Sequence, residues 1–179
     1  MPFRSVDSPI VGRPLRPVGS RAVNEYDWLV FAHITGAFLL LGGAVVAGVL
    51  NIAALRRERP SEIALLFGLA RFAAIAIVTG IWLTLIFGLW LVHNVGYGYG
   101  DGWIVTALIL WFAGSAIGGF GGRRDRKTAE LAARLAAEGD APSPALRARV
   151  RDPVSLAASY GSSLIIVALL AIMIWKPGA

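Results

Sequence analysis

A run of 28 residues without a charged side chain decides the fold: WLVFAHITGAFLLLGGAVVAGVLNIAAL, residues 28–55. A helix needs about 20 apolar residues to cross roughly 30 Å of hydrocarbon. Residues 72–93, FAAIAIVTGIWLTLIFGLWLVH, form a second such segment, and residues 103–122 and 154–175 form two more. We therefore predict an all-α, polytopic membrane protein, an antiparallel bundle of four transmembrane helices at these ranges.

Composition independently indicates a bilayer protein. Hydrophobic residues make up 56% of the chain, charged residues 16%, and the mean hydropathy is +0.66, whereas a soluble domain has about 25% charged residues. The chain has no cysteine, which excludes disulfides, thiolate metal sites and cysteine nucleophiles. We expect the lipid bilayer as its main surroundings and no nucleic acid as a partner.

The chain divides into a short leader and one membrane domain. Residues 1–25 contain four prolines and no long apolar run, so we predict a disordered leader, followed by a membrane domain over residues 26–178. The basic segment 123–153 is predicted to be a cytoplasmic loop. Within it, the spacing of Glu130 and Arg134 predicts a surface helix over Arg126 to Glu138, ended by Gly139.

The distribution of positive charge predicts an orientation. Of the 17 Lys and Arg residues, twelve lie in residues 56–71 or 123–151, and the other five lie in the leader or at Lys176. Short loops rich in Lys and Arg stay in the cytoplasm. Both termini are therefore predicted to lie outside.

His33 and His93 are the only histidines, and they suggest a cofactor. His33 is 23 residues from Arg56 and His93 is 22 from Arg71, which at 1.5 Å per residue predicts that both lie about 33–35 Å above these arginines. Two level imidazoles on neighbouring helices are the minimum for a b-type haem. We predict His33 and His93 as axial ligands of haem iron, with Gly36 leaving room beside the ring. No catalytic residue is predicted.

Several functions remain open on this evidence. A haem protein would pass electrons near the outer face to or from a quinone or another membrane protein. The alternative is a non-catalytic scaffold or assembly partner of another membrane protein, in which the histidines bond to backbone or water and Gly36 and Gly43 form a close helix contact. A transporter is less well supported, because no Asp, Glu, Lys or Arg lies inside a predicted span.

Four short motifs carry a resemblance to a known family. They are WLVFAHITGAFLLLGG at residues 28–43, TGIWL at 79–83, GDGWI at 100–104 and MIWKPG at 173–178. In this order they resemble a bacterial family of small predicted integral membrane proteins, domain-of-unknown-function family 2269, over about residues 26–178. The resemblance implies a four-helix protein of the bacterial inner membrane without an established activity. It places His33 on the family's first-helix histidine and gives His93 no counterpart.

Overall fold

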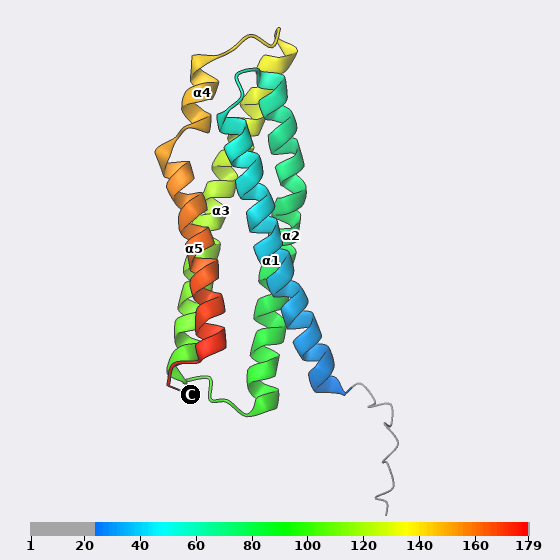
Figure 1. Ribbon diagram of the computed structural model, residues 1–179, viewed down its shortest axis with the longest axis vertical. Helices are drawn as coiled ribbons and strands as arrows, with labels where there is room; N and C mark the ends of the chain where they lie inside the picture. The colour runs from blue at the N-terminus through cyan, green and yellow to red at the C-terminus, as the bar shows by residue number, and fades with distance from the viewer. Residues whose placement is uncertain (1–23, 179) are drawn as a thin grey trace, which may run out of the picture.

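The computed structural model describes residues 24–178, and every regular element among them is a helix (Figure 1). Four segments are long and apolar enough to cross a membrane, which confirms the predicted four-helix architecture. The predicted leader 1–25 lies outside the described residues except for its last two. In chain order the helices are α1 (Glu25–Leu55), α2 (Pro60–Val95), α3 (Gly102–Ala137), α4 (Pro144–Val150) and α5 (Pro153–Trp175).

Local capping signals determine where these helices begin and end. Asn24 and Asp27 form a reciprocal capping box at the start of α1, and α2, α4 and α5 each have a proline in the first turn. Gly96 ends α2 in the left-handed conformation at φ 85°, which glycine adopts without strain.

Two predicted boundaries are wrong. The structure starts α2 at Pro60, not at residue 72, and continues α3 to Ala137, not to residue 122. The predictions ended a helix where charged residues began, but Arg and Lys are good helix formers. The predicted surface helix Arg126 to Glu138 is therefore the second half of α3. Gly139 does follow the end of that helix, with φ of 125°.

The helices associate as two antiparallel pairs, α1 with α2 and α3 with α5 (Figure 1). Glycines bring α1 and α2 into backbone contact. A Cβ built on Gly80 would lie 2.6 Å from both Gly36 O and Leu40 N. One built on Gly43 would lie 2.9 Å from Ala73 O. Close approach of this kind, through small residues, is the usual packing of membrane helices.

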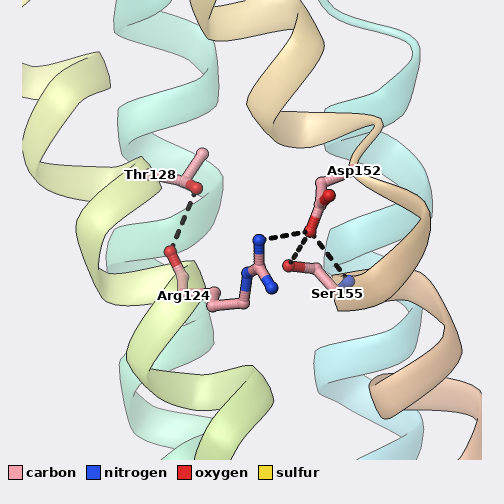
Figure 2. A network of polar contacts seen from close by, with 4 residues as sticks. All are labelled: Arg124, Thr128, Asp152 and Ser155. Carbon is pink, nitrogen blue, oxygen red and sulfur yellow. Dashed lines mark hydrogen bonds and ion pairs between the residues drawn. The ribbon is translucent and has the colours of Figure 1, made fainter.

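The second pair is joined by small residues and by a polar network. Gly118 of α3 packs on Ser162 of α5, and Gly121 packs on Ala158 one turn nearer to α4. Closer to α4, Arg124 of α3 pairs with Asp152 at 3.2 Å (Figure 2). The same Asp152 oxygen accepts hydrogen bonds from the backbone N–H and the hydroxyl of Ser155, which caps the N-terminus of α5.

Trp111 joins the two pairs. Its indole N–H donates to Ile81 O across 3.3 Å, which fixes the register of α3 against α2. Arg71 is ten residues before Ile81, and Gly121 is ten residues after Trp111. Because α2 and α3 are antiparallel, Arg71 and Gly121 therefore lie at the same level. Arg71, Arg124 and Asp152 therefore lie near one plane, which we call the charge plane. Gly43 contacts Ala73 and Ile77 of antiparallel α2. This register places Ala47, one turn further along α1, level with Arg71.

Beyond the charge plane the helices form a compact head, comprising α4 and the parts of α1, α2 and α3 past Ala47, Arg71 and Arg124. Its core is made of Ile63, Ala132 and Leu146, whose exposed fractions are 2%, 0% and 1%. Figure 1 shows α4 lying against this end of the bundle. The predicted basic loop 123–153 is thus largely folded. The apolar face of residues 126–138, which predicts a surface helix, packs into this core.

An exposed carboxylate connects two turns of the head. Asp140 accepts hydrogen bonds of 2.7 Å from both the hydroxyl and the backbone N–H of Ser61. These bonds hold the pKa of Asp140 below its ordinary value, and the bond from the Ser61 hydroxyl has the larger effect. Asp140 also has φ of 57°, which Asp and Asn tolerate better than other side chains.

We expect Asp140→Asn to reduce the pH dependence of stability. A carboxylate with a depressed pKa stabilises the fold above its unfolded pKa, about 3.9, and loses this contribution as pH falls through the folded value. The unfolding midpoints of wild type and Asp140→Asn should therefore differ at pH 6 and approach each other as the pH falls below the unfolded pKa of about 3.9. The measurement is thermal unfolding in detergent across this range. Parallel curves would contradict the assignment.

Candidate binding cavity at the aromatic end

A cavity of about 310 Å³ lies between the two helix pairs, at the end of the bundle opposite the head. Its walls come from α1, α2, α3 and α5 and are mostly apolar. The side chains in its lining that carry a hydrogen-bonding group are Tyr26, His33, Thr84, Tyr97, Trp103, Trp111 and Lys176. A mainly apolar cavity with a few polar groups is the usual form of a small-molecule site.

His33 is half-buried and held by α2. Its Nδ1 lies 3.0 Å from Thr84 O. A carbonyl oxygen only accepts, so Nδ1 carries the hydrogen and Nε2 of the neutral ring is left as an acceptor. A Cβ built on Gly88 would lie 3.0 Å from His33 Cε1. The ring of His33 thus lies against Gly88, where a larger residue would crowd it. Its tautomer is set by the backbone carbonyl of Thr84.

Trp103 contributes a donor without an acceptor. The residue is 7% exposed, and its indole Nε1 is buried with no hydrogen-bond partner within residues 24–178. Its ring packs edge-on against Tyr97, with centroids 5.3 Å apart. A buried unsatisfied donor costs about 1–3 kcal/mol. This cost is removed if a bound molecule accepts the hydrogen bond.

Lys176 brings a positive charge to the same cavity. It follows α5 in the left-handed conformation, φ 41°. Its Nζ lies 3.4 Å from the Tyr97 hydroxyl and 5.1 Å and 5.6 Å from the ring centroids of Tyr97 and Trp103. Cation–π contacts of this length are favourable. The ammonium group and the two aromatic rings therefore form one cluster on the cavity wall.

Gly36 does not have the surroundings that were predicted for it. A Cβ at this position would lie 2.7 Å from Leu83 Cβ and 2.8 Å from Thr84 N. The prediction that Gly36 leaves room for a cofactor beside His33 is therefore wrong, because the backbone of α2 occupies that space. The helix-contact alternative describes Gly36 correctly.

The two histidines do not lie at the same level. His33 contacts Thr84 and packs against Gly88, whereas His93 lies roughly 10 Å further along α2. His93 is exposed and is absent from the cavity lining. The prediction of equal height failed because Arg56 lies in the head, about 13 Å beyond the charge plane, while Arg71 lies in that plane.

The sequence pattern singles out His33 but not the polar groups that line the cavity with it. In the sequence, Trp103 stands out only as part of the GDGWI motif, and Lys176 only as a charge near the end of the last helix. The acceptor from Thr84 is a backbone carbonyl, which leaves no trace in a residue pattern. Gly88 could have been suspected, because a glycine inside a long apolar helix often marks a close approach.

Comparison with known proteins identifies the family. The family model described as "Predicted integral membrane protein (DUF2269)" matches residues 27–177. The chain belongs to the DUF2269 family. The match covers all five helices apart from the first two residues of α1, so every lining residue of the cavity except Tyr26 lies within the DUF2269 domain. No curated protein and no solved structure matches the chain.

Proposed function

We propose that this DUF2269 protein binds a molecule of the quinone class in the cavity that contains His33. The observation that carries the proposal is the buried, unpaired N–H of Trp103 on a mostly apolar wall. A quinone has an apolar ring with an oxygen at each end. In the reduced form, one hydroxyl would donate to His33 Nε2 while the other oxygen accepts from Trp103.

Depth and volume support this class of ligand. His33 is about 14 residues from Ala47, hence about 21 Å from the charge plane, at the depth of the acyl chains. A membrane-soluble molecule can reach this depth through the bilayer. The volume of about 310 Å³ is at the lower end of the 300–1,000 Å³ typical of small-molecule sites, and suits a substituted ring with a short part of its tail.

A b-type haem with His33 as an axial ligand is the second candidate. A metal-ligating histidine almost always donates its other ring N–H to a carboxylate, a backbone carbonyl or water, and His33 makes such a bond to Thr84 O. In this proposal the haem would pass electrons to or from a quinone or another membrane protein. His93, exposed and outside the cavity, is not retained as the second ligand.

The charge distribution supports an orientation for either function. The head and the charge plane carry twelve of the 17 Lys and Arg residues, and cytoplasmic segments are enriched in these residues. We propose that the head faces the cytoplasm of a bacterial inner membrane and that the cavity with His33 lies toward the outer face.

The Trp103→Phe variant tests the quinone proposal. Binding of a short-chain ubiquinone analogue to purified protein in detergent, followed by titration calorimetry, is expected to weaken by roughly tenfold, because one hydrogen bond is lost. His33→Ala should weaken binding of the reduced analogue by a similar factor. Trp90→Phe is the matched control, since Trp90 is 48% exposed and outside the cavity lining.

Two outcomes would overturn this assignment. Wild-type protein that binds neither the oxidised nor the reduced analogue would exclude it. A reduced-minus-oxidised visible spectrum with a Soret band that is lost in His33→Ala would establish haem instead.

A further inference from the structure

A second and larger cavity, about 1,050 Å³, lies between the helix pairs on the side of the head. It extends from Trp111 and Leu169 in the middle of the bundle to Asp125 and Ala133 past the charge plane. One part of it is therefore at the depth of acyl chains, and the other is at the depth of lipid headgroups. Its volume is at the top of the range for small-molecule sites.

The apolar part of this cavity exists because its walls have little side-chain bulk. Five glycines of α3 line it: Gly114, Gly118, Gly119, Gly121 and Gly122. The facing hydroxyls of Ser162 and Ser163 donate within α5 to Ser159 O, so they do not need another acceptor. This surface suits a flexible hydrocarbon chain, which needs room and no polar partner.

The charged part has one arginine available for an anion. The ionisable residues in the lining are Arg71, Asp125, Arg126 and Glu130. Arg126 is already paired with Glu130 at 3.2 Å. Arg71 has no carboxylate within 4 Å and no hydrogen-bond partner in the described part of the chain, and its guanidinium lies 5.5 Å from the Phe72 ring centroid. Asp125 lines both this cavity and an adjoining cleft, which it shares with Asn51 and Ser155.

We propose that this cavity holds one acyl chain of an anionic phospholipid whose phosphate pairs with Arg71. The guanidinium group is planar and binds phosphate oxygens through two parallel N–H donors. Basic pockets between membrane helices recognise anionic headgroups in this way. The position of Arg71 in the charge plane puts this cation at phosphate depth, while the space beside Gly114 and Gly118 lies at chain depth.

Native mass spectrometry of the protein released from mixed vesicles tests the proposal. The vesicles contain equal amounts of phosphatidylglycerol and phosphatidylcholine with the same acyl chains. Wild type is expected to retain phosphatidylglycerol roughly fivefold more than phosphatidylcholine, from one basic contact. Arg71→Gln should lose this preference. Arg123→Gln is the matched control, since Arg123 is an exposed cation near the same plane and outside the lining.

A second variant tests the chain-binding part separately. A Cβ at Gly119 meets nothing within 4 Å, so Gly119→Leu fills the cavity without a backbone clash. It should retain less of both lipids, whereas Gly48→Leu, equally open and outside the lining, should behave as wild type. Equal retention of the two lipids by wild type, an unchanged preference in Arg71→Gln, or full retention by Gly119→Leu would each overturn the proposal.

Discussion

Replacing Gly80 with alanine is expected to lower the unfolding midpoint in detergent by roughly 5 to 10 °C, since overpacking costs about 1–3 kcal/mol or more and each kcal/mol shifts the midpoint by about 2–4 °C. The added Cβ would lie 2.6 Å from Gly36 O and Leu40 N. Both are backbone atoms, so no side chain can move aside. Helices α1 and α2 would have to separate, and Thr84 would lose its contact with His33.

The control for this experiment is Gly42→Ala on α1. A Cβ at Gly42 meets nothing within 4 Å, and alanine is the better helix former by about 1 kcal/mol. Its midpoint should stay level or rise. Gly36→Ala should resemble Gly80→Ala, because the two glycines face each other. If all three variants melted together, the register of α1 on α2 described above would be incorrect.

The second large effect is expected from Leu146→Ala in α4. Leu146 is 1% exposed and forms the core of the head with Ile63 and Ala132. Truncation of a buried leucine to alanine costs about 2–5 kcal/mol. Because α4 has only seven residues, it cannot persist without this contact. We expect a lower unfolding midpoint together with faster proteolysis between α3 and α5.

Leu164→Ala provides the comparison for Leu146→Ala. Leu164 is 70% exposed on α5, where lipid or detergent surrounds it, so the same chemical change should leave both readouts almost unaltered. Resistance of Leu146→Ala to protease, at the wild-type level, would show that the head does not depend on this leucine.

The four-helix bundle could be predicted from the sequence because the length of a hydrophobic run is a property of each segment alone. A charge-free run such as residues 72–93 requires burial in lipid whatever its neighbours are. Helix ends were less accessible to prediction, since a charged residue such as Arg71 marks a membrane boundary without ending a helix. Pro60 was the better signal for the start of α2, because proline is favoured in the first turn.

The site was predicted only as far as single residues allow. His33 was recognised because an ionisable group in an apolar helix needs an explanation. The environment of His33 depends on how the helices pack against one another. Thr84 O on α2 sets the tautomer of its ring, and the donor without a partner belongs to Trp103, far away in the chain. The level of His93 was misjudged for the same reason, since it needed the register of α1 on α2.

Trp111 has a consequence for how the whole bundle can move. The indole ring belongs to the linings of both cavities, together with Leu40, Ile166 and Leu169, and it is also the donor that ties α3 to Ile81 of α2. Trp111 is thus part of the wall between the two cavities and also makes the hydrogen bond that joins the two helix pairs. Any rocking of one helix pair against the other therefore strains the hydrogen bond from Trp111 to Ile81 and changes the wall between the two cavities at the same time.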